Sequence, residues 1–287
     1  MSILEVKNLT HSYSGNTPFI NDAVKDVSFT VEKGEILGII GHTGSGKSTL
    51  VQHLNGLLKP TEGKIFIEDT DIWEKPSEIR KIRSRVGLVF QYPEYQLFEE
   101  TVEADIAFGP KNMGLDGEDL KSRVSEICEI VGVKPEYMGK SPFDLSGGEK
   151  RRVAIAGVMA MKPEVIVFDE PTAGLDPKGR ENVINIIKSY REATGATVII
   201  ISHSMEDMAV LADKLLVMNK GSVFMFDTVS NVFSRKEELQ SVGLGVPIVT
   251  RVFSELKEKG VPVREDIFTV FDAVKELKRL KEGDLNA

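Results

Sequence analysis

The fold of this chain is decided by the stretch Glu35-Ile36-Leu37-Gly38-Ile39-Ile40-Gly41-His42-Thr43-Gly44-Ser45-Gly46-Lys47-Ser48. Residues 35–40 form an apolar run that is typical of a buried strand, and residues 47–58 carry leucine and valine at helical spacing. Between them stands the pattern of Gly, four residues, Gly, Lys and Ser, which is the pattern of a phosphate-binding loop. The sequence therefore predicts a strand, a phosphate-binding turn and a helix.

Each residue type in this turn has a chemical task. Glycines let successive backbone N–H groups point at phosphate oxygens, and the start of the helix adds its partial positive charge. Lys47 would neutralise phosphate charge, and the Ser48 hydroxyl could bind Mg²⁺. We expect the nucleotide phosphates to lie against Gly41, His42, Thr43, Gly44, Ser45, Gly46, Lys47, Ser48 and Thr49.

The flanking sequence predicts an α/β core. Residues 86–90, 165–168 and 197–201 are further apolar runs that alternate with helical stretches, as buried parallel strands do. Residues 4–9 and 27–31 alternate apolar with polar side chains, which indicates half-buried strands at the start of the chain.

The alternation of apolar strands with helical stretches ends at about residue 221. A short strand at 223–226 and a Gly-rich stretch at 243–245 precede two predicted helices. The apolar face of the first holds Ile248, Val249, Val252, Phe253 and Leu256, and that of the second holds Val270, Phe271, Val274 and Leu277. Thr269 and Asp272 form a possible capping pair for the second helix.

Two acids follow the strand at 165–168. Because ligands bind at the carboxyl edge of parallel sheets, we expect Asp169 and Glu170 to face the phosphates. Asp169 would bind Mg²⁺, and Glu170 would orient and partly deprotonate the attacking water.

A second glycine pair opens another helix. Ser146, Gly147 and Gly148 precede an apolar helical stretch, and their hydroxyl and N–H groups could form a second anion-binding helix terminus. The alternative is a serine N-cap with a flexible entry.

Composition excludes several classes. The chain has 287 residues and 36 Lys plus Arg against 44 Asp plus Glu, so its net charge of −8 argues against binding nucleic acid by bulk positive charge. Its one cysteine cannot form an internal disulfide, which favours a reducing compartment such as the cytoplasm. The longest apolar run, residues 153–161, is shorter than the roughly 20 residues of a membrane span, and we expect neither a span nor a signal peptide.

In order and spacing, residues 3–225 resemble the nucleotide-binding subunits of ATP-binding-cassette proteins. The resemblance rests on the phosphate loop, a signature at 145–149, a Walker B strand at 165–170, a D-loop at 174–176, Gln91 and His203. It implies a P-loop NTPase cassette with a RecA-like core, an N-terminal antiparallel β-subdomain and a helical signature subdomain at about 92–160.

The resemblance also implies roles for single residues. Tyr13 would stack on adenine, His203 would contact the γ-phosphate, and Gln91 would reach Mg²⁺ and the catalytic water. Two cassettes would meet head to tail, so that Ser146 and its two glycines cover ATP bound to the partner. ATP would thus close the dimer, and hydrolysis would reopen it.

One residue departs from the family pattern. Glu149 stands where the usual signature has Gln, and a carboxylate near a triphosphate is unfavourable unless it points away or pairs with a base. Lys150, Arg151 and Arg152 are the bases within one helical turn. We expect reduced but not abolished function at this composite site.

Residues 92–98 and 170–180 resemble the energy-coupling factor branch, in which small ATPase subunits drive uptake of vitamins or of metal ions such as cobalt. The resemblance implies a second ATPase, for which it favours a different chain, and a membrane coupling protein that docks near Gln91 and residues 92–98. That protein would carry a substrate-binding membrane subunit. Ordinary packing under a loop is the alternative for residues 92–98. A C-terminal appendage, residues 226–287, would assist dimerisation.

The sequence disfavours two other interpretations. A cassette ATPase acting on DNA or the ribosome usually has a coiled-coil insertion or a second cassette, and neither is visible here. A catalytically dead regulatory cassette is opposed by Lys47, Asp169, Glu170 and His203. The transported substrate does not follow from the sequence. The expected place of the protein is the cytoplasmic face of the cell membrane.

Overall fold

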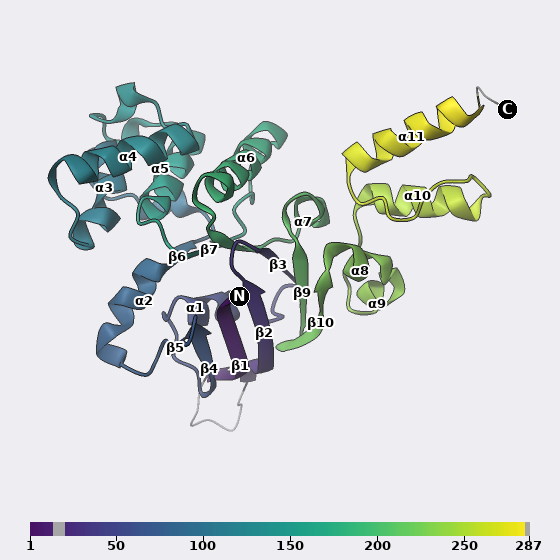
Figure 1. Ribbon diagram of the computed structural model, residues 1–287, viewed down its shortest axis with the longest axis horizontal. Helices are drawn as coiled ribbons and strands as arrows, with labels where there is room; N and C mark the ends of the chain where they lie inside the picture. Colours follow the sequence, from purple (N-terminus) through teal and green to yellow (C-terminus); the bar gives the residue numbers. More distant parts are fainter. Residues whose placement is uncertain (14–20, 285–287) are drawn as a thin grey trace.

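The computed structural model describes residues 1–13 and 21–284, whose strands form two sheets (Figure 1). The antiparallel sheet contains β2 (Asn21–Glu32), β1 (Ser2–Tyr13), β4 (Glu62–Ile67) and β5 (Thr70–Asp71), in that order. The second sheet contains β10 (Ser222–Thr228), β9 (Lys214–Asn219), β3 (Ile36–Ile40), β8 (Thr197–Ile201), β7 (Val165–Asp169) and β6 (Val86–Val89).

The second sheet explains why its strands are apolar throughout. Strands β3 and β6 to β9 are parallel, β10 is antiparallel, and every residue of β3 is buried. The register pairs Ile39 with Ile201 and Asp169 with Ile201, so β3, β7 and β8 end at one edge. Whatever follows these three strands therefore emerges at the same place.

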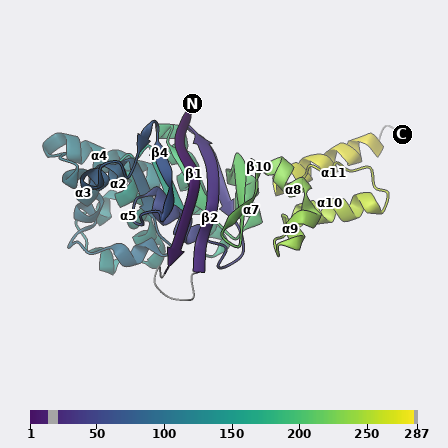
Figure 2. The same ribbon diagram turned by 90° about the horizontal axis from the view of Figure 1, so that it is seen from below.

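Two hydrophobic cores lie on the opposite faces of this sheet. Because strand side chains alternate, Ile39 packs between the two sheets whereas its neighbour Ile40 packs under the helices. Figure 2 shows the antiparallel sheet lying across one face, with helices on the other. Both faces are covered, as a parallel sheet requires.

The helices are α1 (Lys47–Leu54), α2 (Ile79–Arg85), α3 (Val102–Asn112), α4 (Gly117–Val131), α5 (Gly147–Met159), α6 (Pro177–Thr194), α7 (Met205–Leu211), α8 (Val229–Ser234), α9 (Lys236–Ser241), α10 (Ile248–Glu258) and α11 (Val270–Asp284). Helices α3, α4 and α5 pack on one another at one end of the molecule (Figure 1). The proposed boundaries at 92, 160 and 226 stay predictions. The prediction of a helix to residue 58 was wrong, because the chain turns at Gly56 with φ +69° and α1 ends at Leu54.

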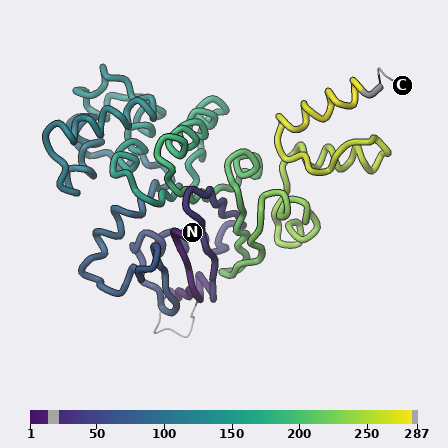
Figure 3. The backbone as a smooth tube through the Cα atoms, viewed as in Figure 1, coloured from purple at the N-terminus to yellow at the C-terminus, as the bar shows by residue number. Residues whose placement is uncertain are grey.

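The C-terminal region holds four helices where the sequence predicted two. Helices α8 and α9 were missed because each has six residues, too few to show a helical period. The capping pair is present, since the Asp272 N–H donates to Thr269 Oγ1 at 3.1 Å. Figure 3 shows this segment leading away from β10 to the end opposite α3 and α4. Residues 285–287 of the predicted appendage lie outside the described residues.

Much of the predicted apolar surface of α10 and α11 faces solvent. Phe253 is buried, but the exposed residues are Ile248, Val252, Val270, Phe271, Val274 and Leu277. In the part of the chain that the structure describes, no helix is both long and apolar enough to span a membrane.

Candidate functional site

The phosphate loop joins β3 to α1 at the carboxyl edge of the parallel sheet. Gly46 has φ +100°, and a Cβ there would lie 2.3 Å from the Ala23 carbonyl oxygen, so only glycine fits. The backbone passes directly beneath β2 at this point. This close approach fixes the loop against the antiparallel sheet.

Lys47 is buried inside the loop. Its ammonium donates to the carbonyl oxygens of Gly41 at 2.7 Å and His42 at 3.0 Å. Burial lowers the Lys47 pKa, while the charges of Glu170 and Asp169 oppose that shift. A phosphate oxygen would be a stronger, charge-assisted acceptor than either carbonyl.

The two acids after β7 lie where the sequence predicts. Asp169 is the last residue of β7, and the Glu170 N–H donates to the Ile201 carbonyl at 3.0 Å, which ties this turn to β8. Burial raises the pKa of both carboxyls. Lys47 opposes the shift in both cases, so the three charged groups form one electrostatic cluster.

His203 approaches Glu170 from the end of β8. The ring Nε2 lies 3.1 Å from Glu170 Oε1, and the His203 N–H donates to Oε2 at 3.4 Å. The ring is not aligned for a hydrogen bond, and Oε1 is buried without a hydrogen-bond partner among the described residues. Burial lowers the His203 pKa, which favours the neutral ring. An unpartnered carboxylate oxygen can accept a proton from water.

These groups surround a cavity of about 830 Å³. Of the predicted residues, its walls include Tyr13, Thr43, Gly44, Gly46, Lys47, Ser48, Thr49, Gln91, Asp169, Glu170 and His203. Gly41, His42 and Ser45 belong to the loop but do not line the cavity. The Tyr13 hydroxyl lies 3.3 Å from Thr49 Oγ1, so the aromatic ring is tied to the first turn of α1.

Sequence reasoning missed one wall of this cavity. Asp22, Ala23, Lys25, Lys220 and Gly221 line it as well. The Lys25 N–H donates to the Gly221 carbonyl at 2.8 Å, joining β2 to the turn between β9 and β10. No local signal could have shown this, because the two segments are far apart in sequence and meet only in the folded chain.

The oxygen atoms at the edge of the cavity suit a hard cation. Ser48, Gln91 and Asp169 all line it and offer hydroxyl, amide and carboxylate oxygens, which are ligands that Mg²⁺ accepts. Asp169 is also hydrogen-bonded to Ser48, which lowers its pKa against the effect of burial. With so few protein ligands, Mg²⁺ would share its coordination with substrate phosphates and water.

The signature lies away from this cavity. Ser146 is the N-cap of α5, and none of Ser146, Gly147 and Gly148 lines the cavity. A Cβ on either glycine would meet no described atom within 4 Å, so this terminus is open. The signature cannot cover a nucleotide bound in the chain's own loop.

Glu149 accepts hydrogen bonds from Ser146 and Tyr137. Its Oε2 accepts from the Ser146 N–H at 2.9 Å and from Ser146 Oγ at 2.6 Å, and its Oε1 accepts from the Tyr137 hydroxyl at 2.7 Å. These bonds lower the Glu149 pKa to about 2. The sequence left open whether this carboxylate points away or pairs with a base among residues 150–152. In the structure it reaches back to its own N-cap, as in a capping box.

Arg151 pairs elsewhere. It is buried, and Nε and Nη2 donate to the two oxygens of Glu94, each at 2.9 Å. Nη1 donates to the carbonyl of Ala173 at 3.0 Å. The planar guanidinium thus joins helix α5 to the segment after Gln91 and to the turn after Glu170.

A parallel sheet with a phosphate loop at its carboxyl edge and two acids opposite defines a P-loop nucleotide-binding cassette. The family profile described as ABC transporter matches residues 24–173. A second profile, an AAA domain described as a putative AbiEii toxin of a type IV system, matches residues 141–208.

Similar proteins narrow the class. The energy-coupling factor transporter ATP-binding protein EcfA2 of Clostridioides difficile is 54% identical over 285 residues, covering 99% of both chains. The protein of that name from Caldanaerobacter subterraneus is 51% identical over 283 residues, with the same coverage. The chain therefore belongs to the ABC transporter family, within its energy-coupling factor ATP-binding proteins, and it is an ATPase.

Solved structures agree with this fold. The structure of cbiO1 from Clostridium perfringens, described as part of the ABC transporter complex cbiONQ, has a TM-score of 0.75 at 36% identity, covering 90% of this chain and 99% of that one. The ATP-binding cassette MJ0796, in a dimeric post-hydrolysis state with ADP and Pi, has a TM-score of 0.70 at 29% identity, covering 79% and 98%.

Proposed function

We propose that this chain is the motor subunit of an energy-coupling factor importer, which works at the cytoplasmic face of the membrane and drives uptake of a vitamin or a metal ion. The observation that carries this proposal is the cavity beside the phosphate loop, where a buried lysine and two half-buried acids converge. Its chemistry suits ATP with Mg²⁺ better than an uncharged ligand.

Within this site the residues have separate tasks. Lys47 and the loop amides bind the β- and γ-phosphates, and Tyr13 offers a ring for adenine. Ser48, Gln91 and Asp169 would hold Mg²⁺, which supplies charge neutralisation on the phosphates when bound. Glu170 takes a proton from the attacking water through Oε1, and neutral His203, whose Nε2 lies 3.1 Å from that oxygen, contacts the γ-phosphate.

The catalytic site is completed by a second ATPase subunit. Ser146 and its two glycines lie outside the chain's own cavity on an open helix terminus, which supports a head-to-tail dimer in which they cover ATP on the partner. Glu149 makes this signature differ from the usual one. This difference, together with the segments at 92–98 and 170–180, favours a partner of different sequence.

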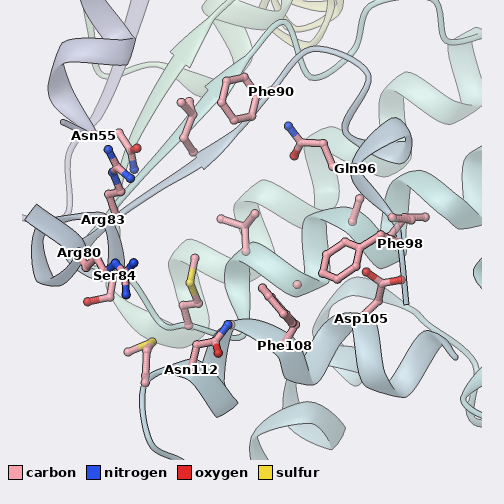
Figure 4. Close-up of a pocket in the computed structure, with 18 of the residues that line it drawn as sticks. Asn55, Arg80, Arg83, Ser84, Phe90, Gln96, Phe98, Asp105, Phe108 and Asn112 are labelled. Atoms are coloured by element: carbon pink, nitrogen blue, oxygen red, sulfur yellow. The ribbon is translucent and has the colours of Figure 1, made fainter. Parts of the chain in front are cut away.

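A groove of about 980 Å³ supports docking of the membrane coupling protein. Figure 4 shows Phe98 and Phe108 on one side, with Arg80 and Arg83 across the groove. Phe98 is 58% exposed, and its ring meets that of Phe108 edge to face with centroids 4.9 Å apart. An exposed aromatic pair beside basic side chains fits an amphipathic helix whose polar end is acidic.

The experiment that tests this function is purification of the tagged chain from gently solubilised membranes of its own cell, with identification of what accompanies it. We expect a membrane coupling protein, a different cassette ATPase and a substrate-binding membrane subunit. Recovery from the soluble fraction with ribosomal or DNA-associated proteins would support the alternative, a cassette ATPase that acts on those partners.

A further inference from the structure

The signature serine already has an acceptor for its proton. Ser146 Oγ donates to Glu149 Oε2 at 2.6 Å, and the Ser146 N–H donates to the same oxygen at 2.9 Å. A serine hydroxyl has a single proton and can donate it to only one acceptor at a time. While Ser146 donates to Glu149, it cannot donate to a phosphate.

Tyr137 holds the other oxygen of this carboxylate. It ends the short 3₁₀ turn Pro135–Tyr137, and its hydroxyl donates to Glu149 Oε1 at 2.7 Å. The ammonium groups of Lys134 and Lys140 lie 5.6 and 4.9 Å from the centre of its ring. The tyrosine is therefore fixed independently of α5, and nothing in the family resemblance assigns it a role.

We propose that Tyr137 and Glu149 form a latch that holds the Ser146 hydroxyl. The γ-phosphate of ATP on the second ATPase subunit must displace Glu149 from this hydroxyl before the dimer closes. This inference rests on the proposed head-to-tail dimer. Tyr137 is a positioning residue in this latch, because it acts on the phosphate site only through Glu149.

The latch has a defined kinetic consequence. The Glu149 carboxylate accepts the hydrogen bond of the Ser146 hydroxyl. It also places negative charge at the α5 N-terminus, where a phosphate would otherwise meet partial positive charge. Closure must therefore begin at higher ATP concentration. After displacement the catalytic groups are the same, so KM for ATP is raised and kcat is nearly unchanged.

The test uses the chain assembled with its second ATPase subunit, with KM and kcat for ATP measured for four variants. We expect Glu149→Gln to lower KM about tenfold, since a neutral amide is a weaker competitor for the hydroxyl than a charged carboxylate. Tyr137→Phe should lower KM about threefold. The double variant should match Glu149→Gln alone. The control, Glu126→Gln, removes an exposed carboxylate that bonds to Lys162 instead, and it should leave KM unchanged.

The change in KM at nearly constant kcat is the readout that a merely structural role would not move, and it should not depend on pH. Because the Glu149 pKa is lowered to about 2, the carboxylate stays ionised and the fall in KM should be equal from about pH 6 to 9. A KM that stays the same or rises in Glu149→Gln overturns the latch, as does a Tyr137→Phe variant that melts earlier with unchanged KM.

Ser146→Ala separates the latch from the dimer. If this variant abolishes ATP-driven closure while Glu149→Gln leaves KM unchanged, the latch is wrong and the composite site stands. If Ser146→Ala leaves closure and hydrolysis unchanged, the signature does not contact the partner's ATP, and both proposals fail.

Discussion

At Glu170, features that are unfavourable for the stability of the folded chain are the ones that suit catalysis. It has φ +50°, a conformation that costs a non-glycine residue free energy and persists only where its surroundings enforce it. Its side chain is half-buried, and the buried oxygen Oε1 has no hydrogen-bond partner among the described residues. A group kept in such an unfavourable state is suited to accept a proton from water, as a general base must.

Glu170→Gln should bind ATP normally and slow hydrolysis about 10²- to 10³-fold, because the amide cannot accept the proton of the attacking water. The measurement is single-turnover hydrolysis alongside nucleotide affinity, with closed dimer detected by gel filtration in ATP. Robust remaining turnover would remove Glu170 from its role as base.

The same substitution should stabilise the free protein at neutral pH. Burial raises the Glu170 pKa above its unfolded value, so the native state binds the extra proton and stability declines as pH rises through the folded pKa. Removing the charge should raise the Tm at pH 7.5 by about 2 °C. The gain should vanish below the unfolded pKa of about 4.3, where both states are protonated. Thermal melts at the two pH values would contradict this if the gain grew in acid.

At the scale of elements, one guanidinium joins three segments of the chain, namely α5, residues 92–98 and the turn after Glu170. Arg151 on α5 bonds to Glu94 in the docking segment, residues 92–98, and to Ala173 beyond Glu170. Its carbon Cζ also lies 5.7 Å from the centre of the Tyr92 ring. We therefore expect a partner that docks on residues 92–98 to act on α5, which carries the signature, through Arg151.

Phe98→Ala should uncouple transport from hydrolysis. The exposed ring belongs to the docking groove and lies outside the nucleotide cavity, so we expect unchanged ATP affinity but loss of most substrate uptake in reconstituted vesicles. Phe143→Ala, which removes an equally exposed ring outside the groove, is the control. Full uptake by the Phe98 variant would exclude the docking segment from the membrane interface.

At the scale of the whole molecule, the C-terminal helices form a small unit with its own core. Phe253, Val263, Ile267 and Ala273 are buried together, apart from the two main cores. The opposite face of α11 exposes Val270, Phe271, Val274 and Leu277. An apolar row of this kind on an end that projects from the cassette supports its proposed part in ATPase dimerisation.

Phe271→Asp should weaken the ATPase pair without unfolding the chain. The side chain is 71% exposed, so the monomer should lose little stability, whereas a charge in an apolar contact should raise the dimer dissociation constant at least about tenfold. Analytical ultracentrifugation without nucleotide measures this change. An unchanged dissociation constant would place the contact elsewhere.

The sequence by itself determined the α/β core, the phosphate loop and the two acids at the end of β7. Each of these features is a local pattern whose period or spacing is compatible with one local structure. The apolar runs at 36–40 and 165–168 suit only strands buried on both faces, and Gly46 is required by its own backbone angle. The edge of the sheet then follows, since parallel strands end together.

Only the tertiary structure decided which side chains that are far apart in the sequence lie close together. Lys25 lines the nucleotide cavity from β2, and Lys220 lines it from the turn between β9 and β10; neither segment carries a motif. Arg151 pairs with Glu94, which lies far from it in the sequence. Glu149 is hydrogen-bonded to Tyr137 and Ser146 and not to the bases that follow it in the sequence. Charge patterns in a sequence say which groups could pair. Only the fold sets the distances and burial on which each pairing energy depends.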